Sequence, residues 1–160
     1  TRAEGGRVFA YEPAPDAFLR LKKNIELNNL QGRVFAFPLA VAAETGKRKM
    51  FFQENSTGSS FFDDYLSGGE QIIETTTLAL FDIFAQNHIV RCDFLKMDCE
   101  GAEYEILFNI PDQIFSRIKR IALEYHKGRQ GLDSFLEGHG FEVFCPNPEK
   151  IIGMLYAKRK

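Results

Sequence analysis

Short apolar runs alternate along this chain with segments whose apolar residues recur at helical spacing. Residues 7–11 (RVFAY) are typical of a buried strand, which must stop after Glu12 because Pro13 cannot continue a central strand. Residues 16–30 place their apolar side chains three and four positions apart, with most charged residues on the other faces, which predicts an amphipathic helix. The chain therefore opens with a strand followed by a helix.

The same alternation continues to the end of the sequence. Strands are expected at residues 33–42, 47–53, 72–77, 93–98 and 120–125, and helices at 78–86, 102–108 and 132–137, with a helical turn at 111–116. Residues 141–144 and 151–157 are expected to pair as a closing antiparallel hairpin. This order predicts a single α/β domain over residues 1–160 with a mostly parallel sheet.

Amino-acid composition indicates a globular domain and limits the kinds of partner that it can bind. The chain has 160 residues, of which 44% are hydrophobic and 26% charged, as in an ordinary globular domain. A net charge of −2 argues against a nucleic-acid partner, and no apolar run is long enough to cross a membrane. Cys92, Cys99 and Cys145 form an odd set without zinc-ligand spacing, which favours a reducing compartment and hence the cytoplasm.

Residues suited to binding a ligand follow several of the predicted strands. In open parallel sheets, ligands bind beyond the carboxyl ends of the strands. Such positions are Glu12, the pair Leu39 and Ala40, residues 98–100 and residues 124–126. A carboxylate at Glu12 could accept hydrogen bonds from both hydroxyls of a ribose, although a lone acid before a proline is more often an exposed loop residue. The strongest indication of a ligand-binding site is that polar residues occur at the carboxyl ends of several predicted strands.

Three carboxylates surround one glycine in residues 95–103 (LKMDCEGAE). Acidic residues in the first turn of a helix interact favourably with its dipole, by about 0.3–1 kcal/mol each. This explanation suits Glu100 and Glu103, but it suits Asp98 less well because Asp98 is predicted to belong to the strand. Gly101 permits a tight turn or the close approach of a ligand. Asp98 is therefore predicted to be functional.

Glu124 and His126 lie two residues apart, so in an extended strand they point the same way. A carboxylate beside an imidazole can raise its pKa or orient it as a base, but the pair could equally be a structural ion pair. Ser59 and Ser60 belong to a Ser/Gly-rich segment, residues 55–60, that could cover a polar substrate. A solvated loop is the alternative reading of that segment.

Four stretches occur together in an order that is typical of one protein family. They are residues 8–13 (VFAYEP) with 21–28 (LKKNIELN), residues 93–107 (DFLKMDCEGAEYEIL), residues 123–126 (LEYH) and residues 140–143 (GFEV). Their most specific part is the Lys-x-Asp-x-Glu-Gly core. With these stretches the chain resembles, over nearly its whole length, the FkbM-type family of S-adenosylmethionine-dependent methyltransferases.

The resemblance implies a Rossmann-like class I methyltransferase sheet of seven strands, the last antiparallel. It implies S-adenosylmethionine as cofactor and methyl transfer to a hydroxyl of a small molecule or glycan. The cofactor would lie against Glu12, Pro13, Leu39, Ala40 and Asp98, with the ribose on Glu12 and the adenine beside Leu39 and Ala40. Asp98 would lie where cofactor and acceptor meet.

A hydroxyl acceptor also requires a base, for which Glu100, Glu124 and His126 are the candidates beside Asp98. No residue is assigned to a metal site, although Asp98, Glu100 and His126 offer an alternative as ligands of a divalent cation such as magnesium.

One departure from the family concerns the start of the chain. The family's sheet begins with a strand and a glycine-rich cofactor loop, and residues 1–6 (TRAEGG) are too short to form them. The chain is therefore expected to be a fragment that lacks this strand, which would lie between residues 7–11 and 93–98.

Two alternatives to a methyltransferase remain open. One is a non-catalytic remnant or binding module with the same fold. The other is a nicotinamide-dinucleotide enzyme, since an acid after the second strand also suits NAD. The Lys-x-Asp-x-Glu-Gly run and the antiparallel end argue against NAD.

Overall fold

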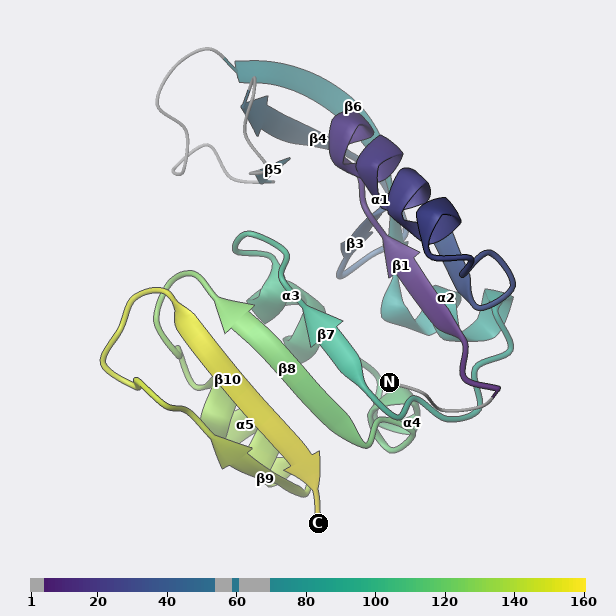
Figure 1. The fold of residues 1–160 in the computed structure, drawn as a ribbon. Helices are drawn as coiled ribbons and strands as arrows, with labels where there is room; N and C mark the ends of the chain where they lie inside the picture. Colours follow the sequence, from purple (N-terminus) through teal and green to yellow (C-terminus); the bar gives the residue numbers. More distant parts are fainter. Residues whose placement is uncertain (1–4, 54–58, 61–69) are drawn as a thin grey trace.

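The computed structural model describes residues 5–53, 59–60 and 70–160, and Figure 1 shows strands alternating with helices along the chain. This confirms the predicted α/β class. The elements are β1 (Val8–Tyr11), α1 (Pro15–Leu27), β2 (Val34–Phe37), β3 (Ala40–Ala42), β4 (Gly46–Gln53), β5 (Ser59–Ser60), β6 (Glu70–Ala79), α2 (Leu80–Gln86), β7 (Leu95–Met97), α3 (Glu103–Phe108), α4 (Asp112–Phe115), β8 (Arg120–Tyr125), α5 (Leu132–Gly138), β9 (Phe141–Phe144) and β10 (Gly153–Arg159).

The described strands form mixed sheets. A two-stranded parallel sheet joins β1 to β2, and two four-stranded sheets have the orders β3-β6-β4-β5 and β7-β8-β10-β9. β10 runs antiparallel to both β8 and β9, which confirms the predicted closing hairpin. The sheets are less parallel than the sequence suggested because β4 and β6 pair as a long antiparallel ladder.

The single strand predicted at residues 33–42 is wrong, because the structure has two strands there. β2 ends before Pro38, and β3 begins at Ala40. Proline has no N–H to donate to a ladder, so the pairing breaks at that point. The two pieces then join different partners, since β2 pairs with β1 and β3 pairs with β6.

Two further boundaries differ from prediction at positions that concern the site. β7 ends at Met97, so Asp98 follows the strand rather than belonging to it. Ser59 and Ser60, predicted to lie in a loop, form the short strand β5 opposite Phe52 and Phe51. Their side chains, and residues 54–58, lie outside the described part of the structure.

β1 and β7 are not paired in the described structure. β1 pairs with β2, and β7 pairs with β8. The missing strand that the sequence predicted between residues 7–11 and 93–98 stays a prediction. The arrowheads of β1, β7 and β8 nevertheless point the same way in Figure 1, so the carboxyl ends of these strands face the same edge of the molecule.

The largest buried side chains pack the helices α3, α4 and α5 against the sheet that contains β7 and β8. They include Ile106, Leu107, Phe115, Leu123, Tyr125, Leu132, Leu136, Phe141 and Leu155. Complete burial of such a side chain contributes about 1.5–3 kcal/mol to stability. The ends of β7 and β8 are therefore anchored in the best packed part of the molecule.

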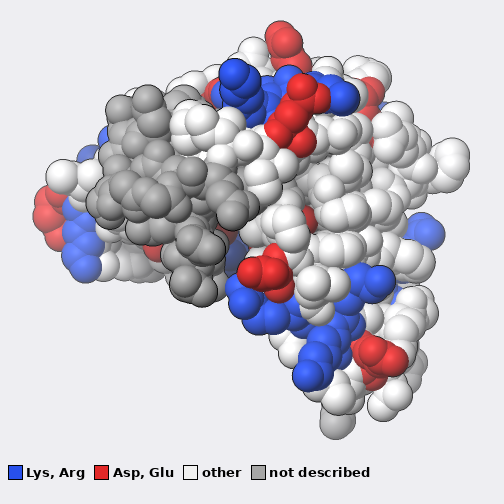
Figure 2. All heavy atoms as spheres, turned by 90° about the horizontal axis from the view of Figure 1, so that it is seen from above, with Lys and Arg blue, Asp and Glu red and all other residues white. Residues whose placement is uncertain are grey.

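Charged side chains of both signs are interspersed on the face shown in Figure 2, with uncharged areas between them. The net charge of −2 is therefore not concentrated on this face. Among the residues that the structure describes, no helix combines the length and the apolar composition needed to cross a bilayer.

Candidate active site

Three potential ligands meet at the carboxyl ends of β7 and β8. In this parallel pair Met97 lies opposite Leu123, so Asp98, the next residue, comes level with Glu124. β8 ends at Tyr125, so His126 is the first residue after the strand. One side-chain ligand atom from each of Asp98, Glu124 and His126 lies within 4.8 Å of the others. The structure therefore brings together the polar ends of both strands, as the sequence predicted.

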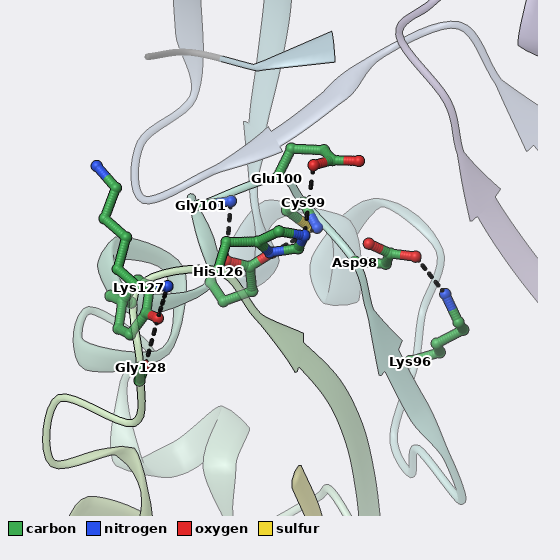
Figure 3. Close-up of polar contacts among 10 residues, drawn as sticks. Lys96, Asp98, Cys99, Glu100, Gly101, His126, Lys127 and Gly128 are labelled. Atoms are coloured by element: carbon green, nitrogen blue, oxygen red, sulfur yellow. Dashed lines mark hydrogen bonds and ion pairs between the residues drawn. The ribbon is translucent and has the colours of Figure 1, made fainter. Parts of the chain in front are cut away.

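His126 is held between two carboxylates (Figure 3). Its Nδ1 lies 3.2 Å from Oε1 of Glu103, and its Nε2 lies 3.3 Å from Oε2 of Glu100. The His126 side chain is 6% exposed. Burial alone lowers the pKa of His126, but the hydrogen bond to Glu103 and the nearby charges of Glu103, Glu100 and Glu124 outweigh burial, so the pKa lies above its ordinary value.

Glu103 is the fully buried anchor of this arrangement. Its carboxylate accepts hydrogen bonds from the backbone N–H of Cys99 at 2.7 Å and of Gly101 at 3.0 Å, besides its contact with His126. The interpretation of Glu103 as a first-turn acid that only complements the helix dipole is wrong. An ionised carboxylate can only accept, so Nδ1 of His126 carries the proton in this contact.

A tight turn with left-handed backbone angles directs these amides at Glu103. The φ angles of Glu100 and Gly101 are 49° and 103°. Glycine adopts such a φ without steric cost, whereas Glu100 needs support from its surroundings. The turn also places the Glu100 side chain next to His126, and that side chain is 38% exposed. Burial is the main reason why the pKa of Glu100 is raised.

Asp98 lies at the outer side of the cluster and contacts Nζ of Lys96 at 3.1 Å (Figure 3). The Asp98 and Lys96 side chains are 38% and 61% exposed, so this ion pair is accessible to solvent. Exposed pairs of this kind contribute about 0–1 kcal/mol to stability. Asp98 can therefore exchange Lys96 for another cation at little cost.

Tyr104 fixes the loop that follows His126, a role that the sequence did not reveal. Its hydroxyl donates to the carbonyl of Gly128 at 2.6 Å and accepts from the backbone N–H of Lys127 at 2.8 Å. Only the position of Tyr104 in the first turn of α3, beside Glu103, could have suggested it.

The remaining predicted cofactor residues lie after β1 and around the start of β3. Oε1 of Glu12 accepts a hydrogen bond from the N–H of Ala14 at 2.9 Å, just before α1, so Glu12 also shapes the start of that helix. Pro13 is partly buried, Leu39 packs against the core, and Ala40 is buried. Their contact with a cofactor stays a prediction, as does substrate binding by Ser59 and Ser60.

The possible metal ligands differ from the set that the sequence suggested. The sequence offered Asp98, Glu100 and His126, whereas the group with suitable spacing contains Glu124 in place of Glu100. Glu100 instead contacts Nε2 of His126 from the neighbouring turn.

Comparison with known proteins identifies the family. The family model for the methyltransferase FkbM domain matches residues 1–150. The chain belongs to this family. The chain is 31% identical over 170 residues to 31-O-demethyl-FK506 methyltransferase FkbM of Streptomyces tacrolimicus, a match that covers 87% of this chain and 65% of the relative. Methyltransferase sdnD of Sordaria araneosa is 22% identical over 168 residues, covering 86% of this chain and 65% of sdnD.

A solved structure with a similar fold is the METTL16 MTase domain, at a TM-score of 0.55 and 14% identity. The match covers 96% of the FkbM-family chain and 50% of the METTL16 chain, and it supports the fold alone. The chain spans about 65% of the length of each of the two relatives described above.

Proposed function

We propose that this FkbM-family protein transfers a methyl group from S-adenosylmethionine to a hydroxyl oxygen of a small molecule or glycan. The observation that carries the proposal is the convergence of Asp98, Glu124 and His126 at the ends of β7 and β8, in a chain of this family. In an open α/β sheet this is the edge where a ligand binds.

The residues at this edge fit S-adenosylmethionine. Carboxylates complement its sulfonium and ammonium charges, and Glu12 offers an acceptor for ribose hydroxyls after β1. Leu39 provides apolar surface for the adenine. When bound, this cofactor supplies an electrophilic methyl group.

The protein's own residues would position the acceptor and take its proton. Alignment of two reacting groups can supply about 7–11 kcal/mol of the barrier, so placement of the acceptor oxygen is the main task. Glu100 is a partly exposed carboxylate beside His126 and would receive the hydroxyl proton. Glu103 fixes the His126 ring, and His126 in turn holds Glu100 at 3.3 Å.

Calorimetric titration with S-adenosylhomocysteine tests the cofactor assignment. The titration uses the 160-residue chain and, where its gene encodes residues upstream, the same chain extended by them. Binding to either form supports the proposal, and binding to the extended form alone would locate the cofactor loop upstream. Absence of binding to both forms would contradict the proposal and favour a non-catalytic module.

The variant Glu12→Gln, made in the form that binds, tests the ribose contact. Glutamine keeps one oxygen for the N–H of Ala14 but loses the charge. A hydrogen bond to a charged group is worth about 1.5–3 kcal/mol, so affinity should fall roughly 10- to 100-fold. Glu26→Gln, an exposed glutamate of α1, is the matched control and should bind like the parent protein. Equal affinities of the two variants would exclude Glu12 from the cofactor site.

A further inference from the structure

We propose that Asp98, Glu124 and His126 bind one divalent cation of the hard class, Mg²⁺ or Mn²⁺. The binding site is inferred from the geometry of these three side chains. The role of the cation in activating an acceptor hydroxyl rests on the proposed function.

The spacing of the three side chains suits a single ion. Their ligand atoms lie within 4.8 Å of one another. An octahedral Mg²⁺ ion binds oxygen at about 2.1 Å, which separates its ligands by roughly 3–4 Å. Asp98 is exposed and Glu124 is partly buried, so small side-chain rotations can bring these atoms onto one centre. Glu124 belongs to β8, and Asp98 and His126 directly follow the paired strands β7 and β8, which gives the site a rigid base.

The support behind His126 is an independent observation that points to a ligand. A histidine that binds a metal through one ring nitrogen generally donates the other N–H to a carboxylate, which fixes the ring and its tautomer. Glu103 has this position relative to Nδ1 of His126. Glu103 is itself fully buried and fixed by two backbone amides. Nε2 of His126 contacts Glu100 at 3.3 Å, so a cation bound at Nε2 would take the place of the partly exposed Glu100 carboxylate and leave that carboxylate beside the ion.

The charge at this edge also favours a cation. Four acidic side chains are close enough for their charges to act on Glu100 or His126: Asp98, Glu100, Glu103 and Glu124. Among the contacts between described residues, His126 meets Glu100 and Glu103, and the exposed Lys96 meets Asp98. The Asp98 and Glu124 carboxylates would attract a divalent ion more strongly than Asp98 attracts an exposed lysine. Two carboxylates and one imidazole are a donor set that suits Mg²⁺ or Mn²⁺ better than soft metals.

The cation would give the acceptor a defined place. A hydroxyl bound to a divalent ion becomes more acidic, and its proton would pass to the Glu100 carboxylate beside the site. The new C–O bond forms as the C–S bond of the sulfonium breaks, and the electron pair of that bond stays on sulfur. Atoms and charges balance because the proton remains on Glu100 until solvent removes it.

Manganese titration followed by electron paramagnetic resonance tests the site, since free Mn²⁺ gives the signal and bound Mn²⁺ loses it. The protein should bind about one equivalent, and excess Mg²⁺ should release it. Asp98→Asn and Glu124→Gln should each weaken binding at least tenfold. The matched control is Asp93→Asn, because Asp93 is also an exposed carboxylate in contact with a basic residue, Arg91, but lies before β7.

Glu103→Gln tests the supporting role separately. Loss of such a partner weakens metal binding by about 10- to 100-fold. Thermal unfolding of each variant verifies that it is folded at the temperature of the titration. If Asp98→Asn and Glu124→Gln bind Mn²⁺ as Asp93→Asn does, or if the parent protein shows no saturable binding, the site does not exist.

The same preparations, titrated with S-adenosylhomocysteine, separate this inference from the proposed function. Cofactor-product binding without Mn²⁺ binding would overturn the metal site and leave the methyltransferase proposal standing. Mn²⁺ binding without S-adenosylhomocysteine binding, in both the 160-residue and the extended form, would support the site and contradict the proposed function.

Discussion

Glu103 should be the carboxylate whose removal costs the most stability at this site. It satisfies two backbone donors, the N–H groups of Cys99 and Gly101, and it contacts Nδ1 of His126. A buried donor left without a partner costs about 1–3 kcal/mol. Glu103→Ala should therefore lower the free energy of unfolding by roughly 2–6 kcal/mol through the two amides alone.

Glu103→Gln isolates the polar contacts from the loss of volume. The single oxygen of glutamine can serve Cys99 and His126, but its NH₂ group then faces the N–H of Gly101. One unsatisfied donor predicts a loss of about 1–3 kcal/mol. Glu105→Gln in the same helix is the matched control, because Glu105 makes a partly exposed ion pair with Arg48. Loss of that pair should cost at most about 1 kcal/mol.

Urea unfolding measures these differences directly. With a slope of about 2 kcal/mol per molar urea, a loss of about 2 kcal/mol moves the midpoint by about 1 M. Coincident unfolding curves for Glu103→Gln and Glu105→Gln would refute the argument that Glu103 anchors the turn. A Glu103→Ala protein with the same free energy of unfolding as the parent protein would also refute that argument.

Two further predictions concern stability at residues other than the carboxylates. A Cβ on Gly153 would lie 2.5 Å from the hydroxyl oxygen of Tyr125, so Gly153→Ala should cost about 1–3 kcal/mol in urea unfolding, whereas Gly46→Ala, where a Cβ meets nothing within 4 Å, should cost far less. Burial raises the pKa of Cys99 from 9.0 to about 12, so between these pH values the unfolded chain loses a proton that the folded protein keeps. Stability should then fall by up to about 1.4 kcal/mol per pH unit from Cys99, and Cys99→Ala should show a shallower decline in thermal unfolding measured from pH 9 to 11. An unchanged slope in that variant would contradict the assignment to Cys99.

The strand ends could be predicted from sequence because local signals determine them. β1 ends before Glu12 and Pro13, and Pro38 marks the end of β2. Apolar runs located β7 and β8, and parallel pairing then placed Asp98 level with Glu124. What the sequence did not reveal was the partition of residues 33–42 between two sheets, since that depends on β6, which is distant in sequence.

The burial of Glu103 could not be predicted because the same residue type at the same helical position is usually solvated. Its burial depends on His126, 23 residues later, which contacts Glu103 from the end of β8. The sequence contained one indication of this. A glycine two residues before Glu103 permits a left-handed turn, and such a turn can direct backbone amides at the following side chain.

That turn links the strain in the backbone to the chemistry proposed for the site. Glu100 has a φ of 49°, a conformation that costs a residue with a side chain about 1 kcal/mol or more. Such a conformation persists where its surroundings determine it, and here Glu103 fixes the amides on both sides of Glu100 while His126 contacts its carboxylate. A relaxed turn would place the Glu100 side chain elsewhere. The buried carboxylate therefore keeps the partly exposed one in position at the ends of β7 and β8, where the acceptor proton would be received.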